Sequence, residues 1–255
     1  MLRQLAAGVA ALTIASLAHA EPTPVTVHVI SQDGKYIGDS MGGAEIILRD
    51  VESGALLARG VTRGSTGNTT QIMETEGRSP LRATPDAAGF ETTLDLSKPT
   101  LVRLEARGPL SHPASQLRVT AERWLIPGER LDAGNGWTIE MPGLVVALIS
   151  DPGRPHAGSR LQITAHVQLM CGCPITRGGI WNADDYEVSA LVYRKGKLLT
   201  QTPLSFESDP GRFAGIIRLG TEGRSELIIT AHNRKTGNSG LVVHPMQIIA
   251  ASPKP

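Results

Sequence analysis

Hydrophobic and polar residues alternate along almost the whole chain after Glu21, and this period of two predicts β-strands. The clearest case is the segment 161–169, in which every odd position is apolar and every even position is polar. No segment after Glu21 repeats apolar residues at helical spacing over a dozen positions. We therefore predict an all-β chain. Further strands are expected at 25–30, 44–49, 56–62, 101–107, 117–124, 137–149, 186–193, 213–219, 227–231 and 241–249.

The number and spacing of these strands predict two domains. Short strands spread over about 235 residues fit two antiparallel β-sandwiches of roughly 100 residues each better than one barrel. Two prolines and a glycine at 151–155 interrupt two strong strands, so a boundary is expected there. The predicted domains are therefore 21–150 and 151–255. The polar segment 75–88 has two prolines and no period, and we expect a long exposed loop that could form a binding edge.

Two local patterns resemble known β-sandwich families. In the first half, Gly42–Asp50 is followed by a turn at 52–54 and a second strand at 56–60. This order resembles the transthyretin-like or carboxypeptidase-regulatory-like sandwich over residues 25–125. In the second half, 211–217 and 225–231 resemble the last strands of an immunoglobulin-like domain, and bacterial envelope proteins that accompany copper-dependent oxidases carry similar endings. The resemblances imply a fold far more than a function.

The first twenty residues have the composition of a signal peptide. Arg3 precedes an apolar run from Leu5 to Leu17, and Ala18-His19-Ala20 is the small-x-small pattern that signal peptidase cleaves. The run is shorter than the roughly 20 apolar residues that a spanning helix needs. We expect cleavage near Ala20 and a periplasmic or secreted mature chain without a transmembrane span.

Charge and missing motifs exclude several functions. The chain has 25 Lys+Arg against 24 Asp+Glu, and only three residues each of Trp, Tyr and Phe. A nucleic-acid surface would need a clustered basic patch and stacking rings. The sequence has neither Gly-x-Ser-x-Gly nor His-Glu-x-x-His, and the glycine-rich segment 64–68 is expected to be a hairpin turn. Trp124, at the end of a predicted strand, is expected in the core. We predict a non-catalytic protein.

Both cysteines lie in one motif, Met170-Cys171-Gly172-Cys173-Pro174, at the end of the clearest strand. With one residue between them they cannot bridge distant parts of a core. Continued alternation would point Cys171 inward. Positions i and i+2 of a strand lie roughly 6.5 to 7 Å apart, the outer limit for a disulfide, whereas a turn could bring the sulfurs together.

Three interpretations of this motif remain open. The cysteines could form a structural staple. Met170, Cys171 and Cys173 could instead hold Cu(I), because thiolates and a thioether are soft ligands. A small-ring disulfide between Cys171 and Cys173 could also serve thiol redox chemistry. For Cu(I) binding or for redox chemistry, Trp181, in a nearby glycine-rich loop, could close over the sulfurs as a gate.

Together these patterns predict an exported, non-catalytic protein that binds a ligand or a partner, with another envelope protein as the expected partner. Cu(I) is the one cofactor that the motif suggests. A thiol-disulfide redox accessory factor and a purely structural protein-interaction module are the alternatives.

Overall fold

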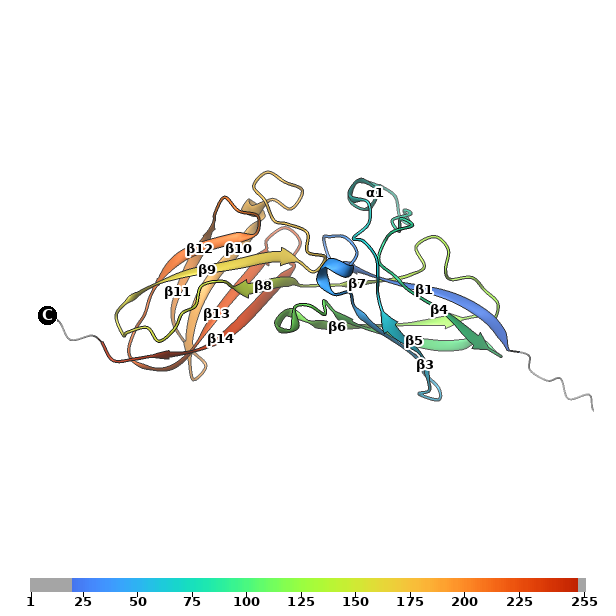
Figure 1. The fold of residues 1–255 in the computed structure, drawn as a ribbon, viewed down its shortest axis with the longest axis horizontal. Coiled ribbons are helices and arrows are strands. Elements are labelled where there is room, and N and C mark those ends of the chain that lie inside the picture. The colour runs from blue at the N-terminus through green and yellow to red at the C-terminus, as the bar shows by residue number, and fades with distance from the viewer. Residues whose placement is uncertain (1–19, 252–255) are drawn as a thin grey trace, which may run out of the picture.

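The protein forms two β-sandwiches that lie end to end along the long axis of the molecule (Figure 1). The computed structural model describes residues 20–251, so nearly all of the predicted signal segment 1–20 lies outside the described residues. The first strand begins at Glu21, directly after the expected cleavage site. The all-β prediction is confirmed.

The N-terminal sandwich consists of two sheets that enclose one core. Its core is formed by inward-facing residues such as Val27 of β1, Leu48 of β2 and Leu104 of β5. Strand β1 runs antiparallel to β4 and parallel to β7. One sheet has the order β4 (Phe90–Leu96), β1 (Glu21–Ser31), β7 (Trp137–Met141), and the other β3 (Leu56–Val61), β2 (Glu45–Asp50), β5 (Thr100–Gly108), β6 (Leu117–Leu125).

A single seven-stranded antiparallel sheet forms the C-terminal sandwich, and its two end strands, β14 and β8, contact each other. The alternation predicted for 161–169 is confirmed, since Ile163, Ala165, Val167 and Leu169 are buried in its core. The strand order is β14 (Ser239–Ile248), β13 (Gly223–Asn233), β10 (Tyr186–Arg194), β11 (Lys197–Phe206), β12 (Arg212–Arg218), β9 (Arg160–Leu169), β8 (Leu144–Leu148).

The strand predicted over 137–149 is in fact two strands in different sheets. Pro142 has no backbone N–H to donate, and Gly143 adopts a φ of 114°, which side chains disfavour. The chain therefore leaves β7 in the N-terminal sandwich and enters β8 in the C-terminal sandwich at this pair. The predicted limits 21–150 and 151–255 stay a prediction, and the change of sheet falls earlier, at Pro142-Gly143.

A long connection between β3 and β4 covers one side of the N-terminal sandwich. Segment 64–68 is not a hairpin turn, because it leads into the short helix α1 (Thr69–Met73), where the Asn68 side chain accepts the Gln71 N–H. The following loop is largely exposed as predicted, although Ala87 and Ala88 are buried against Tyr36. None of the helices in the described part of the chain could cross a membrane. The single-turn helices are η1 (Asp39–Met41), η2 (Pro113–Ser115) and η3 (Ala183–Asp185).

Trp124 is exposed, contrary to the prediction that it lies in the core. The register of β6 against β5 pairs Trp124 with Leu101 on the outer face of the sheet. Its residue exposure is 63 %. The inward positions of β6 are instead taken by Val119 and Ala121, which pack against the N-terminal core.

Candidate functional site: the Cys-Gly-Cys turn

The cysteines lie in a tight turn that follows β9. The Gly172 N–H donates a hydrogen bond to the Leu169 carbonyl at 2.9 Å, and Gly172 adopts a φ of 77°. This left-handed conformation is readily adopted only by glycine. It brings the Cα atoms of Cys171 and Cys173 to 5.4 Å, and the two sulfurs form a disulfide. A turn rather than an extended strand thus joins the pair.

The three predicted metal ligands point into different cores. Cys171 is 1 % exposed and Cys173 is 4 % exposed, and both belong to the C-terminal core. Met170 is also 1 % exposed, but its side chain packs into the N-terminal core. The structure therefore brings the two cysteines together and separates Met170 from them.

The turn that follows β1, residues 31–35, covers the disulfide. A Cβ atom added to Gly34 would lie 2.9 Å from the Cys171 sulfur, so the backbone of this turn touches the sulfur closely. The Lys35 N–H donates to the same sulfur at 3.4 Å. Behind Gly172, a Cβ atom would meet the Met41 sulfur at 2.8 Å. The N-terminal sandwich thus encloses the disulfide from two sides.

Trp181 helps to hold this covering turn in place. Its indole Nε1–H donates to the Asp33 carbonyl at 2.6 Å, while its ring packs against the C-terminal core. The Thr236 hydroxyl donates to the Asp33 carboxylate at 2.5 Å. Asn238 donates to the Gln32 carbonyl at 3.3 Å. Trp181 acts here as a clamp across the junction, and whether it gates access to the sulfurs stays a prediction.

Asp33, Thr236 and Asn238 were not identified from the sequence. The Asp33-Gly34 dipeptide is a typical hairpin signal, and it correctly marks a turn. Nothing in the local pattern shows which loop the turn contacts, because its partners lie about 200 residues away along the chain.

Among the other soft side chains, Met41 approaches the turn at Gly172. Met141 is buried in the N-terminal core and Met246 in the C-terminal core. The exposed His156 has its Nδ1 atom 2.7 Å from the Ala250 carbonyl. Across residues 20–251 no group of three or more His, Cys, Asp or Glu side chains is placed to hold a metal ion.

A polar pocket of about 650 Å³ lies beneath the β3–β4 connection. His28 forms part of its wall, with Nδ1 2.8 Å from the Ala88 carbonyl. Since a carbonyl only accepts, Nδ1 carries the proton. Burial lowers the pKa of His28, which favours the neutral imidazole. The rim carries Arg63, Asp86 and Glu91. The pocket therefore offers charged and hydrogen-bonding groups at a surface that the long loop forms.

A second cleft, of about 480 Å³, lies at the junction and is apolar. Its lining includes Leu117 of the N-terminal sandwich and Leu144, Met170 and Leu241 of the C-terminal part of the chain. Leu117 and Leu241 are both exposed.

The fold defines an all-β protein built from two β-sandwiches. No family model matches the chain, and no curated protein does. Fibronectin(III)-like modules of Clostridium thermocellum CbhA are 10% identical, with a TM-score of 0.31 over 84% of this chain and 82% of theirs. An ICAM-5 D1–D4 ectodomain fragment is 14% identical, with a TM-score of 0.29 over 82% of this chain and 46% of its own. The fimbrial anchor protein Mfa2 from Porphyromonas gingivalis is 12% identical, with a TM-score of 0.20 over 86% and 80%.

Scores this low carry no argument about what the chain does. The transthyretin-like resemblance of residues 25–125 is not confirmed by these comparisons and stays a prediction.

Proposed function

We propose that the protein is an exported, non-catalytic interaction module whose two β-sandwiches are held in one relative orientation. In this proposal the Cys-Gly-Cys turn is a structural clasp. The observation that carries it is the enclosure of the disulfide by the turn 31–35, through the Lys35 N–H and the close approach of Gly34 to the Cys171 sulfur.

Export is supported by two independent features. The composition of residues 1–20 is that of a cleavable signal, and β1 begins at Glu21. A disulfide that joins the only two cysteines of the chain fits an oxidising compartment, because disulfides are rare in the reducing cytosol.

The copper and redox alternatives each require the junction to open. Cu(I) binding would need the disulfide to be reduced and Met170 to leave the N-terminal core, since thiolates rather than a disulfide are the ligands. Thiol exchange would need an attacking thiolate to reach sulfurs that the turn 31–35 covers. A structural clasp needs neither rearrangement.

A thiol count and a copper competition test this assignment. The mature chain, isolated without reductant, is expected to show no titratable thiols even in guanidinium and to leave Cu(I) on bicinchoninate. A Cys171→Ser/Cys173→Ser variant should also leave Cu(I) on bicinchoninate, but it should unfold at a lower temperature than the wild type. Stoichiometric copper transfer that is lost in the variant would instead establish copper handling. Rapid reduction of the native disulfide by a small dithiol would instead support the redox role.

The recognition surface that we propose is the loop 75–88 with the polar pocket beneath it. Leu81 on this loop exposes about half of its surface, and the pocket adds His28, Asp86 and Glu91. Long loops on rigid sandwiches are frequent binding sites.

Photo-crosslinking in the cells that produce the protein tests this surface. A benzophenone amino acid in place of Leu81 is expected to give one discrete adduct with another envelope protein. The same substitution at Ile216, a comparably exposed residue of β12, is the matched control and should give none. Equal products at both positions, or none at Leu81, would reject the loop as the recognition surface.

A further inference from the structure

Strand β6 is a long, unpaired edge of the four-stranded sheet, and β7 of the facing sheet lies near it. It pairs with β5 along nine residues without a register shift and has no pairing on its other side among the described strands. Its sequence, LRVTAERWL, contains neither proline nor glycine. The other long edge strand, β14, contains Pro245, and β3 has an irregular register against β2. Proline and bulges protect sheet edges from pairing, and β6 has neither.

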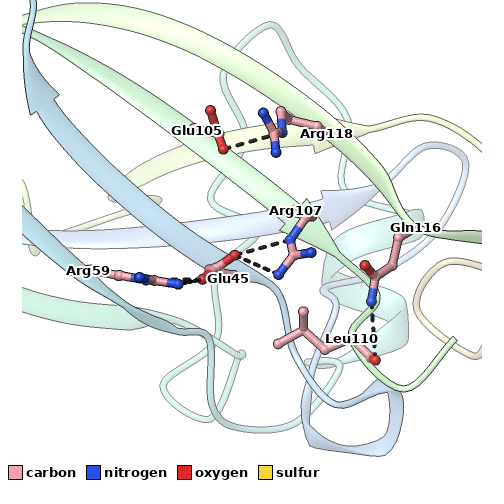
Figure 2. A network of polar contacts seen from close by, with 7 residues as sticks. All are labelled: Glu45, Arg59, Glu105, Arg107, Leu110, Gln116 and Arg118. Atoms are coloured by element: carbon pink, nitrogen blue, oxygen red, sulfur yellow. Dashed lines mark hydrogen bonds and ion pairs between the residues drawn. The ribbon is translucent and has the colours of Figure 1, made fainter. Parts of the chain in front are cut away.

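The outer face of this sheet carries a ladder of ion pairs that ends at β6 (Figure 2). Glu45 accepts hydrogen bonds from both Arg59 and Arg107. Arg118 of β6 contacts Glu105 at 3.3 Å. The charges on this face do not balance. It carries five arginines, Arg49, Arg59, Arg103, Arg107 and Arg118, against three glutamates, Glu45, Glu105 and Glu122.

Two like-charged pairs stand directly opposite each other on this face, Arg49 with Arg103 inside the sheet and Arg107 with Arg118 at its β6 edge. The register places Arg118 directly opposite Arg107, and like charges in directly opposed positions destabilise a sheet. Four residues along the same strand, Glu122 faces Arg103 and contacts it at 2.7 Å. Arg118 and Glu122 therefore lie two positions before and two positions after Thr120, on the same exposed face of β6.

We propose that β6 pairs antiparallel with β6 of a second copy of this chain, about a two-fold axis through Thr120. This register sets Arg118 opposite the partner's Glu122, and Glu122 opposite the partner's Arg118. Each added carboxylate offsets the Arg107–Arg118 repulsion. Because the axis is perpendicular to the sheet, outward residues stay outward, and the two four-stranded sheets become one continuous sheet.

The same register accounts for the exposed tryptophan. Trp124 lies four residues beyond Thr120, so it falls opposite the partner's Gln116, at the segment that leads into the partner's β6. Large exposed aromatic residues are typical of interfaces rather than of free edges. This self-association does not depend on the interaction function proposed above.

Charge reversal with mixing tests the pairing. Wild-type chain is expected to sediment as a concentration-dependent dimer. In a dimer of Arg118→Glu, the new glutamate faces Glu122 of the second copy. In a dimer of Glu122→Arg, the new arginine faces Arg118 of the second copy. Each substitution therefore places like charges opposite each other and should weaken dimerisation at least tenfold. An equimolar mixture of the two variants restores both cross-strand pairs and should form a heterodimer. Glu226→Arg, a reversal at an exposed position of β13, is the matched control and should dimerise as wild type does.

Mixing separates this interface from simple destabilisation. Each reversal also removes an ion pair within its own chain, with Glu105 or with Arg103, so each variant's unfolding temperature is measured alongside. A loss within the chain cannot be repaired by adding the other variant. A wild-type chain that stays monomeric up to millimolar concentration, or a dimer that is indifferent to both reversals, would overturn the proposal.

Discussion

At the level of single residues, glycines decide how closely the two sandwiches meet. Gly34 and Gly172 lie on opposite sides of the clasp, and a methyl group on either would collide with a sulfur atom of Cys171 or Met41. The sequence shows such glycines only as turn signals, because the atoms that they approach belong to distant segments. Burial likewise makes His28 different from the exposed histidines of the chain.

The buried His28 predicts that stability falls in mild acid. Its folded pKa lies below the unfolded value of about 6.5 because burial disfavours the imidazolium. Below about pH 6.5 the unfolded chain therefore binds a proton that the folded chain does not bind. The free energy of unfolding should decrease from about pH 6.5 down to the folded pKa of His28. Urea denaturation at several pH values between 7 and 5 measures this slope.

Substitution assigns this slope to His28. His28→Asn keeps a donor towards the Ala88 carbonyl and should flatten the slope, and His232→Asn, at an exposed position, should leave it unchanged. Part of the slope should persist in His28→Asn, because burial also lowers the pKa of His166. The carboxylates with lowered pKa, such as Asp86, contribute only at lower pH. An unchanged slope in His28→Asn would show that this imidazole is not the titrating group.

At the level of elements, alternation predicted most strands, and the failures have identifiable causes. In β4, Thr92 takes a position that the pattern expects to be apolar, so alternation does not predict this strand although Leu94 and Leu96 are buried. In β11, adjacent exposed leucines and Pro203 hide the period. Across 137–149 the odd positions stay apolar through Pro142-Gly143, so a period-two pattern cannot show that the chain changes sheets there.

The candidate site was predictable in part for the same reason. The alternation along β9, continued past Leu169, correctly predicts that Cys171 lies on the buried face. It places Met170 on the opposite face. On an isolated sandwich that opposite face would meet solvent, where a thioether could serve as a ligand. Here the N-terminal sandwich covers it. Which surface covers a strand is a property of the tertiary fold and leaves no mark in the local sequence.

At the level of the whole molecule, the C-terminal sandwich completes the core of the N-terminal one. Met170 and Val145 belong to the C-terminal part of the chain but pack into the N-terminal core. The Val146 N–H donates to the Ser115 hydroxyl at 3.3 Å, which adds a polar link in the reverse direction. Burial of apolar side chains is the main favourable term in folding. Unfolding of the C-terminal sandwich would therefore expose part of the N-terminal core, so we expect the two sandwiches to unfold together.

Met170 tests this coupling because its backbone and its side chain serve different sandwiches. Met170→Ala should cost about 2–5 kcal/mol and should split the single calorimetric transition of the wild type into two, since the apolar link is lost. Met246→Ala removes a buried methionine within the C-terminal core alone. That variant should unfold at a lower temperature and still in one transition. Two transitions in the wild type would mean that the sandwiches unfold independently. One transition in Met170→Ala would mean that the hydrogen bonds of Asp33 and Asn238, rather than the shared core, couple them.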